Sequence, residues 1–213
     1  MPDETDGRDA APMPSTADGT GGTGGTGGTG GTGGNSGIGD TGDGPGSVLR
    51  RLVAAAVGVD AGDLGDALDG RLRVVERGDR PAPSARALEL LAGENESIVG
   101  VVPRIDPALV RGLSRGLSGS IGGDVRLVLT GTASERLTGA VGPAVRSALA
   151  DRGVDAFVHD GHSTVAVLLV AERAVVGLFD GDGLAAVAWS DDPAVREWAA
   201  ATCRRYLAAA DPI

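Results

Sequence analysis

The sequence contains no lysine, so all of its basic side chains are arginines. It has 19 of them against 29 acidic residues, which gives a formal net charge of −10 at pH 7. A Walker A nucleotide loop needs a lysine to reach the phosphates, so that class of site is excluded. An acidic chain also repels nucleic-acid backbones and anionic lipid. We therefore expect no direct nucleic-acid binding and no membrane binding.

Cysteine and long apolar runs are equally scarce. Cys203 is the only cysteine, so no intrachain disulfide is possible and a secreted, disulfide-rich fold gains no support. No apolar run reaches about 18 residues, and the N-terminus lacks the basic start and apolar stretch of a signal peptide. We expect a cytoplasmic protein. The missing lysine, the acidity and the few aromatics indicate a halophilic, high-salt cytoplasm, although GC-biased codon usage explains the same composition.

Composition divides the chain near residue 46. More than half of positions 19–46 are glycine, mostly in repeated Thr-Gly-Gly units. Such a segment has almost no apolar side chains to offset the entropy of ordering. We predict a disordered, acidic, Gly/Thr-rich tail over residues 1–45 and one folded domain over residues 46–213.

The first part of this domain alternates apolar runs with helical patterns, which is typical of an α/β fold. The runs at 97–102, 124–130 and 155–160 indicate buried strands, and helical patterns lie between them at 106–117 and 134–153. Strands joined by helical crossovers pair in parallel, so these three predict a parallel core. Gly142-Pro143 predicts a break in the second helical pattern. Shorter patterns predict a helix at 47–57, a strand at 72–76 and a helix at 86–91.

After His162 the pattern changes to strand runs joined by tight links. Residues 164–172, 173–180 and 184–191 predict an antiparallel meander, with Asp180–Gly183 as a hairpin turn rather than a calcium loop. Asp192-Pro193 then predicts the start of a closing helix. Its core-facing stripe is predicted to contain Val195, Trp198, Thr202 and Tyr206.

Three short motifs lack the context that their chemistry requires. The GxGxxG match at 19–24 has no strand before it and no helix after it, so it does not indicate a dinucleotide site. In the GxSxG match at 112–116, Ser114 lies inside a helical pattern rather than on a sharp turn. His159 and His162 are too few for a zinc site. We expect no cofactor and no metal.

Four segments together resemble a known family of effector domains: 86–110, 124–130, 146–160 and 165–210. They are similar to the effector domain of archaeal transcription regulators, in particular the methanogenesis-regulator FilR middle domain, which looks related to the sugar-sensing domain of TrmB regulators. The most specific part is the meander followed by SDDPAVREWA and Tyr206. The resemblance implies a phospholipase D-like α/β fold with a parallel strand core, a C-terminal meander and a closing helix.

The resemblance also implies ligand sensing and dimer contacts in a halophilic archaeon. Phospholipase D enzymes use two His-x-Lys dyads, so a chain without lysine is not expected to be an enzyme of that kind. Such regulators normally begin with a winged helix of roughly 60 residues, and residues 46–61 are too few for one. We therefore expect a domain that does not read DNA directly.

Polar residues follow each strand of the predicted parallel core, where open α/β sheets bind ligands. They are Arg104 and Asp106 after the first strand, Thr130 after the second, and His159 and Asp160 after the third. Arg104 would pair an anionic group, the two aspartates would accept from hydroxyls, and His159 could do either. An alternative role for Asp106 is to cap the helix that starts at Pro107.

Together with the resemblance, these residues lead us to expect a non-enzymatic ligand-sensing and dimerisation domain of an archaeal transcription regulator. Its expected partners are a small-molecule effector and either a second copy or a winged-helix regulator. Two alternatives remain open. The first is a protein-interaction remnant without a ligand, which the aromatic-poor pocket favours, and the second is a phosphodiesterase-like enzyme, which the missing lysine disfavours.

Overall fold

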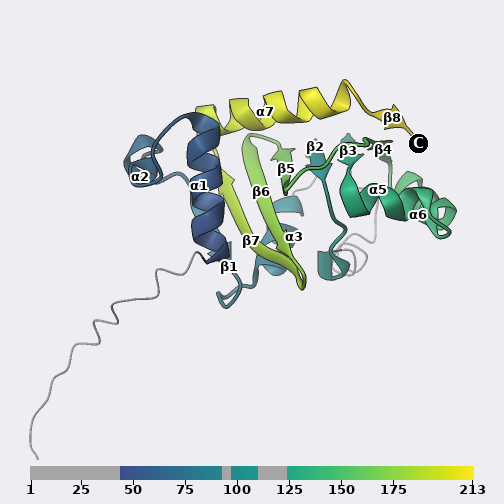
Figure 1. Cartoon of the computed structure of the whole chain (residues 1–213), viewed down its shortest axis with the longest axis horizontal. Helices are drawn as coiled ribbons and strands as arrows, with labels where there is room; N and C mark the ends of the chain where they lie inside the picture. Colours follow the sequence, from purple (N-terminus) through teal and green to yellow (C-terminus); the bar gives the residue numbers. More distant parts are fainter. Residues whose placement is uncertain (1–43, 93–96, 110–123) are drawn as a thin grey trace, which may run out of the picture. The chain divides into compact units, whose positions relative to one another are not determined.

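A computed structural model of the chain describes residues 44–92, 97–109 and 124–213. These residues form one eight-stranded sheet in the order β1-β7-β6-β5-β2-β3-β4-β8 (Figure 1). The strands are β1 (Arg73–Glu76), β2 (Ile98–Val102), β3 (Val125–Leu129), β4 (Val154–Val158), β5 (Val165–Val170), β6 (Arg173–Asp180), β7 (Gly183–Ser190) and β8 (Asp211–Pro212). The helices are α1 (Pro45–Val57), α2 (Leu64–Ala67), α3 (Pro83–Leu91), α5 (Gly131–Thr138), α6 (Gly142–Ala150) and α7 (Pro193–Leu207).

The predicted parallel core is confirmed. β2, β3 and β4 pair in parallel, with Ile98 opposite Val125 and Val125 opposite Val154. The crossover from β3 to β4 consists of α5 and α6, which are separated just before Gly142-Pro143 as predicted. The predicted helix at 106–117 is described only over its first turn, and Ser114 lies outside the described residues.

The predicted meander is also confirmed, and it joins the parallel strands in one mixed sheet. β5 pairs antiparallel with β2, β6 with β5, and β7 with β6. The link between β5 and β6 has Ala171 at φ 49°, and the link between β6 and β7 has Gly183 at φ 118°. Asp180 lies opposite Gly183, so the Asp-Gly-Asp-Gly sequence forms the hairpin turn that was predicted.

Helices cover both faces of the sheet. On one face, α1 and α7 bury Leu49, Val53, Val195 and Cys203 against the strands (Figure 1). On the other face, Ala87 and Leu90 of α3 belong to a buried cluster that includes residues of β2, β3 and β7, among other strands. Burial of this apolar surface on two faces is the main stabilising term of the fold.

The predicted stripe on α7 is only partly correct. The buried residues of this helix are Val195, Ala199, Thr202 and Cys203, whereas Trp198 and Tyr206 are partly buried at the edge of the core. Compared with the prediction, the buried face of α7 contains Ala199 and Cys203 in place of Trp198 and Tyr206. These smaller side chains let α7 lie close to the sheet. Among the described residues, no helix is long and apolar enough to span a bilayer.

Candidate functional site

The predicted site residues all lie at the edge where β2, β3 and β4 have their carboxyl ends. β6 runs parallel to β2, because β5 is antiparallel to both, so the β6–β7 turn lies at the same edge. The structure divides the polar residues there into two groups. The hairpin group consists of Arg77, Arg104, Asp106, Asp180 and Asp182. The histidine group consists of Thr130, Gly131, His159, His162 and Tyr206.

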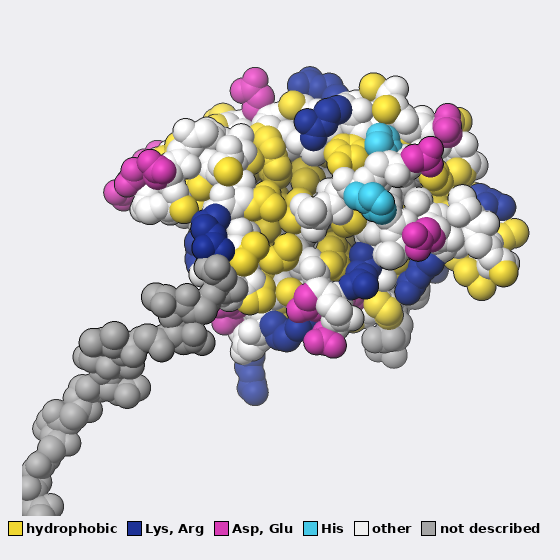
Figure 2. Space-filling model, in the orientation of Figure 1, with side chains coloured by type: hydrophobic (Ala, Val, Ile, Leu, Met, Phe, Trp, Pro, Cys, Tyr) yellow, Lys and Arg dark blue, Asp and Glu magenta, His cyan; other side chains and the backbone are white. Residues whose placement is uncertain are grey.

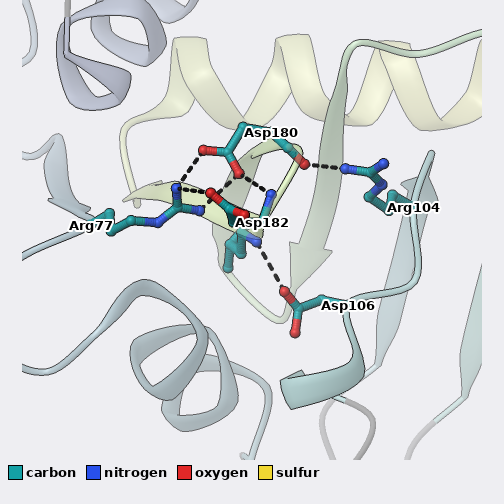
Figure 3. A network of polar contacts seen from close by, with 6 residues as sticks. Arg77, Arg104, Asp106, Asp180 and Asp182 are labelled. Carbon is teal, nitrogen blue, oxygen red and sulfur yellow. Dashed lines mark hydrogen bonds and ion pairs between the residues drawn. The ribbon is translucent and has the colours of Figure 1, made fainter.

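Asp106 is the most highly bonded residue of the hairpin group. Its side chain is only 6% exposed. Oδ1 accepts hydrogen bonds from the N–H groups of Ala108 at 2.7 Å and Leu109 at 3.0 Å, so the helix-capping role considered for Asp106 is confirmed. Oδ2 accepts from the N–H of Leu184 at 2.9 Å, which ties the β2 end to the start of β7 (Figure 3).

Gly183 makes this contact possible. A Cβ atom at this position would lie 2.6 Å from Oδ2 of Asp106, and the residue has φ 118°. L-amino acids with a side chain rarely adopt that conformation. The second glycine of the hairpin turn is therefore required by the approach of the Asp106 carboxylate.

Arg77 joins the hairpin group from β1, on the far side of the meander. Its Nη1 lies 2.7 Å from Oδ2 of Asp180 and its Nη2 lies 2.8 Å from Oδ1, a bidentate ion pair (Figure 3). Nη1 also lies 3.4 Å from Oδ2 of Asp182. The hydrogen bonds from Arg77 are the main reason why the pKa of Asp180 is lowered, and the same pair raises the pKa of Arg77.

Arg104 approaches the same turn from the β2 side. Its Nη1 donates to the backbone carbonyl of Asp180 (Figure 3). Three segments that are distant in sequence thus meet at the β6–β7 turn: the end of β1, the loop after β2 and the turn itself. Arg104 and Asp106 were predicted as site residues, but Arg77, Asp180 and Asp182 were not. Arg77 directly follows a predicted strand, and the two aspartates lie in the predicted hairpin turn.

A cavity of about 290 Å³ lies beside the hairpin group. Its polar wall includes Arg77, Asp106 and Asp182, and Ser84 at the start of α3 adds a hydroxyl. Pro83 and Leu184 supply apolar surface. A second hollow of about 360 Å³, near Arg196 on α7, contains none of the predicted residues.

The histidine group is bonded much more sparsely. Thr130 is fully buried, and its Oγ1 has no hydrogen-bond partner among the described residues. Nδ1 of His159 accepts from the N–H of Gly161 at 2.7 Å, and the His159 ring lies 4.9 Å from that of Tyr206. Figure 2 shows both histidines of the protein on the surface of the face that carries α7.

His162 links this group to the start of α5. The Tyr206 hydroxyl donates to the carbonyl of His162 at 3.1 Å. A Cβ on Gly131 would lie 3.4 Å from Nδ1 of His162. Asp160 is exposed. Among the described residues, no cluster of three His, Cys, Asp or Glu side chains is arranged to hold a metal ion.

Residues 81–209 match the family described as methanogenesis regulatory protein FilR1, middle domain. The chain belongs to this family. The family is that of an archaeal transcription regulator, as the sequence resemblance predicted. No curated protein matches the chain.

Solved structures show the fold. Nuc from Salmonella typhimurium, a phospholipase D family member, is similar with a TM-score of 0.52 and 15% identity over 67% of this chain and 97% of that one. TrmBL2, an archaeal chromatin protein, gives a TM-score of 0.48 and 14% identity over 78% of this chain, which covers 66% of the length of TrmBL2. NucT from Helicobacter pylori gives 0.46 and 8% over 67% and 98%. The predicted phospholipase D-like fold class is confirmed by Nuc.

Proposed function

We propose that this FilR1-type middle domain senses a small-molecule effector, which binds in the cavity beside Asp106. The observation that carries the proposal is the position of that cavity. It lies at the carboxyl edge of the sheet, where ligands of open α/β folds bind, and its walls come from segments that are joined through the side chains of the hairpin group.

The wall chemistry suits a polar effector of modest size. The Arg77 guanidinium is 44% exposed and faces a carboxylate, Asp182, that is 87% exposed. In such a pair, Arg77 can leave Asp182 and bind an anionic group of a ligand, while Asp182 accepts a hydrogen bond from a ligand hydroxyl. The Asp106 oxygens already accept three backbone N–H groups, so Asp106 shapes the cavity wall in this proposal. Arg104 is not one of the residues that line the cavity, and it acts on the β6–β7 turn instead.

Binding there would couple to conformation through the same contacts. A ligand shifts an equilibrium only when it binds two states with different affinity. Arg77 offers such a difference, because its pairing with Asp180 and Asp182 holds the end of β1 to the β6–β7 turn. An effector that competes for Arg77 therefore favours a state in which these segments are held differently.

A thermal-shift screen of full-length protein tests this proposal, with neutral sugars, organic acids and nucleotides as probes. A ligand that binds the native state raises the melting temperature. Ser84→Phe should fill the cavity and abolish the shift. Ala85→Phe, on the exposed neighbouring position of α3, is the matched control and should keep it. A shift that survives Ser84→Phe would place the ligand elsewhere, and no shift with any probe would favour the interaction domain without a ligand.

The domain is proposed to act without catalysis and through a partner. The absence of lysine removes the dyad chemistry of phospholipase D enzymes. DNA reading is assigned to a winged-helix regulator, and a second copy of this chain is the other proposed partner. Light scattering and DNA-binding titration in high-potassium buffer test these two partners.

A further inference from the structure

The N-terminus of α1 is capped by a side chain from strand β1. Its own N-cap residue, Gly44, has no side chain to offer, and its first turn contains no acidic residue. The N–H of Gly46 donates instead to Oε2 of Glu76, at the end of β1, at 2.7 Å. A carboxylate at this position satisfies a free helix N–H and interacts favourably with the helix dipole.

Gly46 leaves the space that this contact uses. A Cβ at Gly46 would lie 2.7 Å from Oε2 of Glu76, and one at Gly44 would lie 3.2 Å away. A methyl group at Gly46 would therefore displace the carboxylate. The close approach fixes the first residues of α1 against the end of β1.

Glu76 and Arg77 are consecutive, and they serve opposite faces of the sheet. Glu76 lies opposite Ala186, which belongs to the core beneath α1. Successive side chains of a strand point to opposite faces, and Arg77 lies in the cavity wall beside the start of α3. One peptide unit thus separates the cap of α1 from the cation of the proposed effector cavity.

The turn that carries both residues is held as a unit. Oδ2 of Asp79 accepts from the N–H of Glu76 at 2.9 Å, and the N–H of Asp79 donates to the carbonyl of Glu76 at 3.0 Å. The N–H of Arg77 donates to the carbonyl of Ala185 at 2.8 Å. Displacement at Arg77 therefore reaches Glu76 through a short, hydrogen-bonded segment rather than through a flexible loop.

We propose that Glu76 and Arg77 form a relay from the effector cavity to the N-terminus of α1. The relay rests on the proposed function in that the cavity is its input. When Arg77 leaves Asp180 and Asp182 for a ligand, the restraint on the turn changes, and so does the hold of Glu76 on Gly46. The output lies at Gly44, where residues 1–43 join the described domain. Gly46, Glu76 and Arg77 precede the segment that matches the FilR1 family, whereas Asp180 and Asp182 lie inside it.

Amide exchange at Gly46, measured by NMR on the full chain, tests the relay without any ligand. Glu76→Gln weakens the cap directly and should raise the exchange rate. Arg77→Gln, which removes only the cavity-side ion pair, should raise the same rate by about fivefold or more, the lower end of typical coupling between sites. Arg126→Gln breaks an exposed ion pair with Asp124 at the amino end of β3 and is the matched control. It should leave the rate unchanged.

The outcomes separate the relay from the proposed function. An unchanged Gly46 rate in Arg77→Gln, with a raised rate in Glu76→Gln, would overturn the relay even if the cavity binds an effector. An equal increase in Arg126→Gln would also overturn it, because the effect would then be general loosening. A raised rate in Arg77→Gln alone among the two arginine variants supports the relay even if the thermal-shift screen finds no ligand.

Discussion

The hairpin group and the histidine group lie at the same edge of one sheet, yet the polar side chains of the first group form many more hydrogen bonds than those of the second. In the hairpin group, the buried Asp106 carboxylate accepts three backbone N–H groups and Asp180 binds Arg77 through both oxygens. In the histidine group, the hydroxyl of the fully buried Thr130 has no hydrogen-bond partner in the part of the chain that the structure describes. Nδ1 of His159 accepts a hydrogen bond from Gly161, two residues further along the same turn.

The difference follows from what each group has to join. Around the hairpin group, the end of β1, the loop after β2 and the β6–β7 turn converge beside a cavity, so polar side chains make the connections there. Around the histidine group, β3 and β4 are adjacent strands, and the backbone already connects them through the N–H of His159 and the carbonyl of Leu129 at 3.0 Å. Side-chain bonds therefore join separate segments in the first group, whereas backbone bonds already join β3 and β4 in the second.

The largest expected effect of breaking this pattern is that of Asp106→Ala. It leaves the N–H groups of Ala108, Leu109 and Leu184 without their acceptor, two at a helix start and one in a buried contact. We expect the free energy of unfolding to fall by about 2–4 kcal/mol. Urea denaturation measures it. Asp160→Ala, at an exposed site, is the control and should change stability by less than about 0.5 kcal/mol.

Arg104→Ala should have the next largest effect. It removes the hydrogen bond to the carbonyl of Asp180 and therefore one of the contacts that hold the β6–β7 turn. A hydrogen bond from a charged donor typically contributes about 1.5 kcal/mol or more, and partial exposure reduces this to about 1 kcal/mol here. The same denaturation assay applies, with the exposed Arg136→Ala as control. Equal effects of the two substitutions would mean that Arg104 does not hold the turn.

Local signals in the sequence predicted the elements on which these two predictions rest. Asp106-Pro107 predicted a helix cap, Gly142-Pro143 predicted a break, and the apolar runs at 97–102 and 124–130 predicted parallel strands. Each signal depends on the backbone preferences of neighbouring residues, and these preferences do not depend on contacts with distant parts of the chain. The cap of Asp106 was accordingly predictable, whereas its second bond, to Leu184, was not.

The contacts that the sequence did not predict are those between distant segments. The strand at 72–76 was expected, but nothing local to it indicates that β1 pairs with β7, with Arg73 opposite Trp189. Without that pairing, Arg77 cannot be placed beside Asp180. The two-residue strand β8, which pairs with β4 at Phe157, is too short to leave a pattern. Helical periodicity predicted Trp198 in the core because periodicity identifies the apolar face of a helix. It does not show which residues at the margin of that face are fully covered by the sheet.

Thr130→Val should change stability in the opposite direction to Asp106→Ala. The substitution keeps a β-branched side chain of similar volume. It removes a buried hydroxyl that has no hydrogen-bond partner within residues 44–92, 97–109 and 124–213. Burying an unpaired polar group is costly, so we expect the free energy of unfolding to rise by about 0.5–1 kcal/mol. Thr138→Val is the control, because that hydroxyl lies on an exposed helix position and bonds the preceding turn. A loss of stability in Thr130→Val would show that the hydroxyl has a partner in solution.

The smallest expected effect concerns the protonation of Asp180. The hydrogen bonds from Arg77 lower its pKa below the ordinary 3.8. A lowered pKa in the folded state favours folding above pH 3.8, and this contribution is lost as the pH falls through the folded value. Because both side chains are exposed to solvent, solvent screens the pair and the change in stability is small.

The titration of Asp180 is therefore the sharper measurement. The carboxyl carbon shift of Asp180, followed by NMR, should have a midpoint below 3.8 in the wild type and return toward 3.8 in Arg77→Gln. Identical midpoints in the two proteins would mean that the ion pair does not persist in solution, and the hairpin group would then be as loosely bonded at its exposed end as the histidine group.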